Sequence, residues 1–230
     1  MQKPKQLIFD FYLNRKASLQ HFYFNSQRLA FLFNLKNFSR FPKEFLVMGG
    51  AGSGKSYLTQ AYLNDASSMG IKSGFIPLQA IIETSITSLE GYENFELVVI
   101  DGLENLSQSK TWQTIIFNFL NHAHQTNCKT ILTASRALSE LDFFPDLHSR
   151  ITRMEMESLL ELQHDQLFDA ITFVSESYDI SISDKEVEYL LTRYHRDMGS
   201  IMNAIHSLDK LSASQKRKIT VPLVKEFLDS

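Results

Sequence analysis

The sequence of 230 residues has very little cysteine and no long apolar run. Its single cysteine, Cys128, excludes an internal disulfide and is typical of a reducing compartment. A membrane-spanning helix needs about 18 consecutive apolar residues, and the sequence has no such segment. The polar residues Asp10, Asn14 and Arg15 interrupt the apolar stretch that a signal peptide would need. We therefore expect a cytoplasmic protein in which Cys128 is an ordinary structural thiol.

Positive charge is also scarce. The formal net charge is −3, with 23 Lys and Arg residues against 26 Asp and Glu residues. Autonomous DNA binding needs a clustered positive surface, and the one dense basic run, 216–218, is short enough to be a connection between two helices. His122 and His124 would point to different faces of a predicted helix, so they do not form a metal site. These patterns disfavour direct DNA binding and histidine-based metal binding.

The most informative segment is the octapeptide 49–56, which matches the G-x-x-x-x-G-K-[ST] pattern of a phosphate-binding loop. Its glycines let the backbone fold into a nest whose N–H groups converge on phosphate oxygens. Lys55 adds a positive charge toward the β- and γ-phosphates, and the Ser56 hydroxyl can bind Mg²⁺. The helix that begins here directs its partly positive end at the same anion. The predicted nucleotide-binding residues are Gly49, Gly50, Ala51, Gly52, Ser53, Gly54, Lys55, Ser56 and Tyr57.

The order of the predicted elements supports this interpretation. Residues 45–48 predict a buried strand that leads into the loop, and 57–69 predict a helix that leaves it and stops at Gly70. The alternative, a glycine-rich turn without a ligand, does not require this strand–loop–helix order. Further strands are predicted at 73–77, 97–100, 130–134 and, more weakly, 151–156, alternating with helices at 78–89 and 111–126. Such alternation indicates a parallel sheet with right-handed crossovers.

The pattern changes after about residue 158, where only helices follow. They are predicted at 163–178, 184–194, 200–211 and 221–228, with Ser183 or Asp184 and Thr220 as candidate N-caps. We therefore predict an α/β base, with a parallel five-stranded sheet flanked by helices, and a small all-helical lid. The predicted boundaries are 1–15 for an N-terminal tail, 16–158 for the base and 159–230 for the lid.

Three polar residues beyond the loop are further candidates for a nucleotide site. Asp101 ends a buried strand, and an aspartate at this position of a P-loop protein holds Mg²⁺ directly or through water. Ser135 closes the next strand and could place a hydroxyl near the γ-phosphate, although a serine that merely ends a strand is equally consistent. Arg150 is either a surface residue or an arginine finger that reaches another subunit's nucleotide. The sequence pattern alone leaves both alternatives open.

Together these motifs resemble the AAA+ family. Within it they resemble the bacterial replication initiators of the DnaA type and their short relatives, the regulatory inactivators of the Hda type. The resemblance runs nearly end to end through the loop, Asp101, the segments 133–136 and 144–150 and the helical tail. Because the sequence stops after the lid helices, the initiator's DNA-binding helix-turn-helix is expected to be absent. The ending 218–226 also favours the short relatives. The resemblance implies ADP or ATP as ligand, with Mg²⁺.

The N-terminal hexapeptide 6–11 resembles the motif by which proteins bind the replication sliding clamp. In an extended peptide Leu7, Phe9 and Phe11 share one face, so they could fill an apolar pocket while Gln6 forms a hydrogen bond at its edge. Phe9 stands where the family usually has leucine. The alternative is an N-terminal strand that packs on its own base.

For function, the resemblance implies a negative regulator of replication initiation. A nucleotide-bound adaptor would dock on the sliding clamp, the β subunit of the DNA polymerase, and stimulate ATP hydrolysis by the initiator DnaA through Arg150 in trans. DNA would be contacted only through the clamp, and self-association is common in AAA+ modules. The alternatives are an AAA+ ATPase that remodels or loads a replication partner and a recruiter of DnaA that triggers no hydrolysis.

Two departures from the family pattern predict slow hydrolysis at this chain's own site. Gly102 stands where an active AAA+ ATPase has an acid that orients water, and Glu104 is the nearest acid. In the lid, Gly199 stands where the family usually has a phosphate-sensing arginine. Arg196, about one turn earlier, is the candidate substitute and is included among the nucleotide-binding residues.

Overall fold

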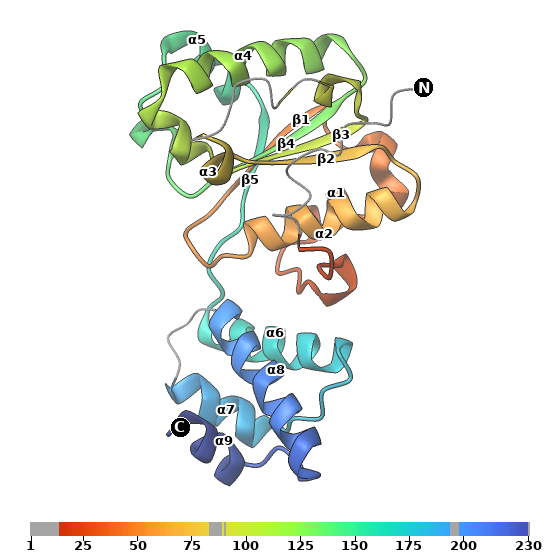
Figure 1. The fold of residues 1–230 in the computed structure, drawn as a ribbon, viewed down its shortest axis with the longest axis vertical. Coiled ribbons are helices and arrows are strands. Elements are labelled where there is room, and N and C mark those ends of the chain that lie inside the picture. The colour runs from red at the N-terminus through yellow and green to blue at the C-terminus, as the bar shows by residue number, and fades with distance from the viewer. Residues whose placement is uncertain (1–13, 83–88, 90, 194–197, 230) are drawn as a thin grey trace. The chain divides into compact units, whose positions relative to one another are not determined.

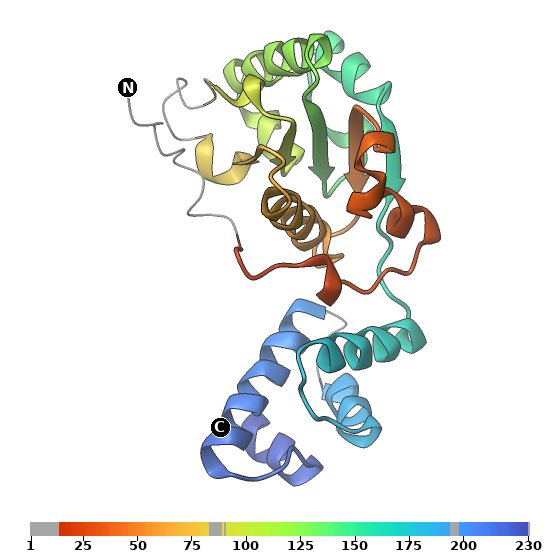
Figure 2. The ribbon, with the colours of Figure 1, turned by 90° about the vertical axis from the view of Figure 1, so that its right-hand side faces the viewer.

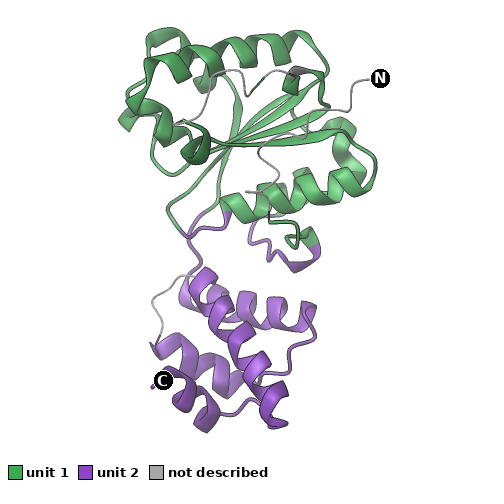
Figure 3. Ribbon diagram, viewed as in Figure 1, with its two compact units in different colours: residues 1–19, 27–51, 55–159 green, residues 20–26, 52–54, 160–230 purple. Residues whose placement is uncertain are grey.

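The computed structural model describes residues 14–82, 89, 91–193 and 198–229. The chain divides into two compact units (Figure 3). Unit 1 contains residues up to 19, 27–51 and 55–159, and unit 2 contains 20–26, 52–54 and 160–230. We keep 16–158 and 159–230 as the proposed bounds of base and lid. The predicted clamp-binding residues and one predicted nucleotide-binding residue lie outside the described residues: Gln6, Leu7, Phe9, Phe11 and Arg196.

A five-stranded parallel sheet forms the centre of unit 1, with the strand order β2-β3-β4-β1-β5 (Figure 1). The inner strands β3 and β4 are buried along nearly their whole length, as expected where helices cover both faces of a sheet. The predicted α/β fold with a parallel sheet is therefore confirmed. The strand bounds are Glu44–Met48 (β1), Ser73–Pro77 (β2), Leu97–Asp101 (β3), Lys129–Ala134 (β4) and Glu155–Ser158 (β5).

Helices flank this sheet on both sides. Figures 1 and 2 show α2 on one face and α4 with α5 on the opposite face. The helix bounds are Gln27–Leu32 (α1), Lys55–Ser68 (α2), Leu78–Ile81 (α3), Lys110–Gln125 (α4) and Pro145–Thr152 (α5). Short 3-10 helices are Leu19–His21 (η2), Leu35–Arg40 (η3), Tyr92–Asn94 (η5), Leu103–Gln108 (η6) and Leu138–Glu140 (η7). α2 ends just before Gly70, whose φ of 85° is the left-handed conformation common after helices.

Successive residues of β1 pack into different parts of the core because side chains alternate along a strand. Phe45 contacts the rings of Phe33 and Phe41 near α2, where Tyr62 completes an aromatic cluster. Leu46 instead belongs to the large cluster that includes apolar residues of α4 and α5. Both clusters are buried, and together they fix β1 and the loop that follows it.

Two predicted elements of unit 1 differ from the structure. The strand predicted at 151–156 was wrong at its start, because α5 continues to Thr152 and β5 begins at Glu155. Leu147 and Ile151 lie one helical turn apart on α5, and both are buried. Ile151, which suggested the start of a strand, is therefore part of the buried face of this helix. The helix predicted at 78–89 begins as α3, and residues 83–88 lie outside the described part of the chain.

Unit 2 contains the four helices predicted for the lid, with a shared apolar core. Their bounds are His164–Ser177 (α6), Asp184–Arg193 (α7), Met198–Gln215 (α8) and Val221–Leu228 (α9). The basic run 216–218 connects α8 and α9, as predicted. Thr220 is the N-cap of α9, without a side-chain capping hydrogen bond. None of the helices in the described ranges is long and apolar enough to cross a membrane.

A buried carboxylate joins two helix starts in this unit. Glu186 is 7% exposed, and its Oε2 atom accepts hydrogen bonds from the amide and the hydroxyl of Ser183, just before α7. Its Oε1 atom accepts a hydrogen bond from the Val221 amide at 3.2 Å, at the start of α9. Helix starts have unpaired N–H groups and a partly positive dipole end, so the carboxylate satisfies both at once.

Candidate nucleotide site

The glycine-rich loop connects the end of β1 to the start of α2. Gly52 and Gly54 have φ values of 78° and 90°, which residues with a Cβ atom rarely adopt. The Gly49 amide donates to the Ala134 carbonyl at 3.1 Å and so fixes the start of the loop against β4. Glycine is therefore needed at positions 52 and 54 of the loop, as the phosphate-binding pattern predicts for a tightly folded backbone.

Lys55, the first residue of α2, is folded back onto this loop. Its Nζ atom donates to the carbonyl oxygens of Gly49 at 2.7 Å and Gly50 at 2.8 Å, and the residue is 6% exposed. Burial lowers the pKa of the ammonium group, while the nearby carboxylates of Glu104 and Asp101 oppose this shift. Two main-chain oxygens thus accept the hydrogen bonds that the Lys55 ammonium group could donate to phosphate oxygens.

Ser56 and Asp101 come together beside Lys55. The Ser56 hydroxyl donates to Asp101 Oδ1 at 3.0 Å and to Oδ2 at 3.1 Å. Thr133 donates from Oγ1 to Asp101 Oδ1 at 2.7 Å and accepts a hydrogen bond from the Gly102 amide at 2.9 Å. A hydroxyl and a carboxylate are hard oxygen ligands of the kind that Mg²⁺ binds alongside water and phosphate. These two side chains would hold the ion, which neutralises phosphate charge when it is bound.

A cavity of about 710 Å³ opens beside these residues in unit 1. It is lined by Lys55, Ser56, Asp101 and Ser135 of the predicted site, and also by Gln60 and Glu104. Glu104 Oε2 accepts a hydrogen bond from the Ser135 amide at 3.0 Å. The cavity thus brings residues from the ends of β3 and β4 to the start of α2, at the carboxyl edge of the sheet where α/β proteins bind ligands.

Gly102 has a backbone that disfavours any other residue. Its φ is 88°, and a Cβ atom there would lie 2.7 Å from Asn105 Nδ2. That amide group donates to the Gly102 carbonyl at 2.8 Å, so it is held in place. An acid cannot occupy position 102 without moving Asn105 and straining the backbone.

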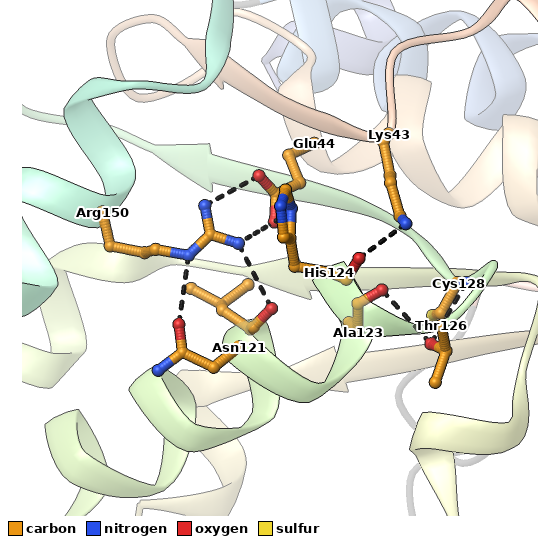
Figure 4. Close-up of polar contacts among 9 residues, drawn as sticks. Lys43, Glu44, Asn121, Ala123, His124, Thr126, Cys128 and Arg150 are labelled. Atoms are coloured by element: carbon orange, nitrogen blue, oxygen red, sulfur yellow. Dashed lines mark hydrogen bonds and ion pairs between the residues drawn. The ribbon is translucent and has the colours of Figure 1, made fainter.

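Arg150 lies elsewhere in unit 1, and it does not line this cavity. Figure 4 shows its guanidinium group beside Glu44, the first residue of β1, whereas the phosphate-binding loop follows the other end of that strand. Nη1 donates to Glu44 Oε2 at 2.8 Å and Nη2 donates to Glu44 Oε1. Nε donates to Asn121 Oδ1 at 3.3 Å and Nη2 donates to the Leu120 carbonyl at 3.3 Å. The Arg150 side chain is only 15% exposed.

Comparisons with known proteins place this fold in a family. A family model described as the lid domain of Hda matches residues 164–228. The chain is 31% identical over 229 residues to an uncharacterized protein of Haemophilus influenzae. The alignment covers 98% of this chain and 99% of that protein.

Solved structures of DnaA resemble the chain in fold. Domain III of the Thermotoga maritima DnaA matches with a TM-score of 0.77 at 16% identity, over 94% of this chain and 97% of that one. AMPPCP-bound DnaA from Aquifex aeolicus matches with a TM-score of 0.72 at 22% identity, over 87% of this chain and 67% of that one. The chain belongs to the DnaA-related AAA+ proteins of the Hda type. Residues 164–228, which form the helices of unit 2, correspond to the lid of that family.

In this Hda-type chain the structure gathers some predicted residues and separates others. Lys55, Ser56, Asp101 and Ser135 line one cavity, whereas Arg150 lies near the amino end of β1. Sequence reasoning missed Thr133, although a polar residue inside the apolar strand 130–134 was a usable signal. It also missed Glu44, which no local pattern connects to Arg150.

Proposed function

We propose that this DnaA-related regulator of replication initiation is a nucleotide-bound cytoplasmic adaptor that lowers the amount of ATP-bound initiator. It would bind ADP or ATP with Mg²⁺ at the phosphate-binding loop, dock on the sliding clamp and stimulate ATP hydrolysis by DnaA in trans. The observation that carries the proposal is the preformed cavity in which Lys55, Ser56 and Asp101 meet, with Gly102 in place of an acid that would orient water. This arrangement favours holding a nucleotide over turning it over.

Nucleotide binding is tested by calorimetric titration of ADP and ATP, with and without Mg²⁺. The wild-type protein should bind both, and Lys55→Ala should weaken binding by at least about tenfold because it removes the positive charge of the loop. Lys36→Ala, at an exposed lysine of η3, is the matched control and should bind like the wild type. A wild-type protein that releases no heat on titration would refute the proposed ligand.

Clamp binding is proposed for the hexapeptide that contains Gln6, Leu7, Phe9 and Phe11, which lies outside the described residues. A double variant, Gln6→Ala with Phe11→Ala, should lose binding to immobilised clamp while it keeps nucleotide binding. Retained clamp binding would remove the tail from the proposal.

The regulatory step is tested by following ATP hydrolysis by DnaA in the presence of clamp-loaded DNA. The wild-type protein should accelerate this hydrolysis, and Arg150→Ala should abolish the acceleration without loss of clamp binding. An arginine finger contributes about 10³–10⁵ in rate where its role is complete. Fast ATP hydrolysis by the purified protein alone would instead favour an ATPase that remodels or loads a replication partner.

A second candidate function is favoured by one specific observation. Because Arg150 is already paired with Glu44 inside its own chain, the protein could recruit DnaA without completing its catalytic site. Under this alternative, Arg150→Ala would bind DnaA and affect its hydrolysis in the same way as the wild type. The hydrolysis assay therefore separates the two candidates.

A further inference from the structure

The guanidinium group of Arg150 is bound to its own chain at all three nitrogen atoms. Nε, Nη1 and Nη2 each donate to an acceptor, and these acceptors come from β1 and from α4. An arginine finger needs several free donors, because it works by sharing them with phosphate oxygens. In this conformation every guanidinium nitrogen atom of Arg150 already donates, and these hydrogen bonds must break before the same donors can act on another molecule.

Glu44 is the part of this arrangement that carries charge. Both of its carboxylate oxygens accept from Arg150, whereas Asn121 and Leu120 contribute neutral oxygens. The Glu44 side chain is 12% exposed, and partial burial strengthens a two-point ion pair relative to one on the open surface. The imidazole of His124 is also near, since its Nδ1 atom lies 3.3 Å from Glu44 Oε1. Glu44 is therefore shared between a permanent cation and an exposed histidine.

We propose that Glu44 is a restraining residue that positions Arg150 against its own base and releases it only to a competing oxyanion. This inference rests on the proposed function, in which that oxyanion is a phosphate of the nucleotide bound to the initiator. A carboxylate and a phosphate offer a guanidinium the same two-point geometry, so one can replace the other without a new kind of contact. Hydrolysis would then begin only where a partner's phosphate is close enough to displace Glu44.

The restraint also separates binding of the initiator from activation of its hydrolysis. Docking through other surfaces would bring Arg150 near the initiator's nucleotide, while Glu44 keeps the finger withdrawn until the phosphate competes for it. A variant that removes the charge of Glu44 but keeps its shape should shift this balance. Glu44→Gln does so, because it keeps one oxygen acceptor for Arg150 and leaves the contacts with Asn121 and Leu120 available.

The first arm of the test needs no partner protein. Phenylglyoxal reacts with accessible guanidinium groups, and mass spectrometry of peptides gives the labelling rate of each arginine. We expect Arg150 to label about three- to tenfold faster in Glu44→Gln, the range that corresponds to the net loss of about one hydrogen bond, because the amide oxygen of Gln still accepts from Arg150. The exposed Arg153 on the same helix end provides an internal reference whose rate should not change. An unchanged rate at Arg150 would overturn the restraint.

Two further variants decide whether the charge is responsible. Asn121→Ala removes a neutral acceptor of Arg150 and should raise its labelling much less than Glu44→Gln. Glu155→Gln removes the acid of an exposed pair with Arg28 and should leave Arg150 unaffected. If Asn121→Ala labels as fast as Glu44→Gln, the Glu44 charge is not the restraint and the inference fails. Unfolding midpoints close to wild type establish that each variant is folded.

The second arm measures stimulation of DnaA hydrolysis as a function of the concentration of this protein. Glu44→Gln should reach half-maximal stimulation at about a three- to tenfold lower concentration, with a similar plateau. The double variant Glu44→Gln with Arg150→Ala should give no stimulation. Faster labelling with unchanged stimulation would show that Glu44 does not control the finger and would overturn the inference. If the wild type gives no stimulation, the proposed function fails, and the labelling arm still decides on the restraint.

Discussion

The Glu104 carboxylate accepts a hydrogen bond from the main-chain amide of Ser135 at 3.0 Å, which joins the segments that follow the paired strands β3 and β4. Both residues line the cavity beside the glycine-rich loop, and Glu104 is close enough to Lys55 to support its charged form. The cavity therefore contains two carboxylates, Asp101 and Glu104, with one ammonium group between the loop and the acids. A polyphosphate that enters must tolerate both negative charges or have them neutralised.

We expect Glu104→Gln to bind ADP and ATP about three- to tenfold more tightly than the wild type when Mg²⁺ is removed with a chelator. One carboxylate fewer lowers the repulsion of the polyphosphate, and the bound phosphates themselves keep Lys55 protonated. Calorimetry at low ionic strength measures the effect, and Glu140→Gln on the exposed η7 controls for the change in net charge. Weaker binding in Glu104→Gln would show that this side chain supports the nucleotide directly.

Gly102→Asp should lower the free energy of unfolding by about 1–3 kcal/mol. The new Cβ would meet Asn105 Nδ2 at 2.7 Å and the backbone would keep a φ of 88°, so the acid would pay both a clash and strain. Urea denaturation measures the loss. The double variant Gly102→Asp with Asn105→Ala separates the effect of the clash from that of the backbone strain. Asn105→Ala should remove the clash, while the strain at position 102 remains. A Gly102→Asp protein as stable as wild type would contradict this account.

Local patterns were enough to predict the parts of the site that are contiguous in sequence or end a strand. The loop pattern placed Lys55 and Ser56, and the apolar strand 97–100 placed Asp101, because parallel strands bring their carboxyl ends to one edge. The parallel sheet followed from the alternation of strands and helices. The short helix α1 has fewer than two turns, gave no periodic signal and was not predicted.

Contacts between distant residues could not be predicted in the same way. Glu44 and Arg150 are separated by 106 positions, and each has ordinary neighbours in sequence, so only the packing of α5 near the start of β1 brings them together. Ile151 also shows the limit of an apolar pattern, because a short apolar segment fits a strand or a buried helix face until its packing is known.

In the lid, Glu186→Ala should lower the free energy of unfolding by about 2–4 kcal/mol. The change leaves the amides of Ser183 and Val221 without the acceptor that now joins the starts of α7 and α9. Glu188→Ala, on the exposed side of the same helix, should change stability by less than about 0.5 kcal/mol. Hydrogen exchange provides the specific readout, since the Val221 amide should exchange faster only in Glu186→Ala. Equal effects of the two variants would mean that the shared carboxylate is not important.

Tyr62 is fully buried in the aromatic cluster, and its hydroxyl has no hydrogen-bond partner in the described part of the chain. A buried polar group without a partner costs stability, so Tyr62→Phe should raise the free energy of unfolding by about 1 kcal/mol at pH 7. The ring contacts with Phe33 and Phe41 remain in this variant. Tyr62→Ala, which removes them, should instead cost about 3–5 kcal/mol.

The advantage of Tyr62→Phe should grow at alkaline pH. Burial raises the pKa of the Tyr62 hydroxyl well above its ordinary value of about 10, whereas in the unfolded chain this group ionises near that value. As the pH rises through about 10, the unfolded wild type loses the Tyr62 proton, whereas the folded wild type retains it. The wild type therefore loses stability from this group, and Tyr62→Phe does not, because it has no hydroxyl to ionise. Urea denaturation of both proteins at pH 7 and pH 10.5 measures the difference. A difference that stays constant between the two pH values would contradict a neutral, buried hydroxyl at position 62.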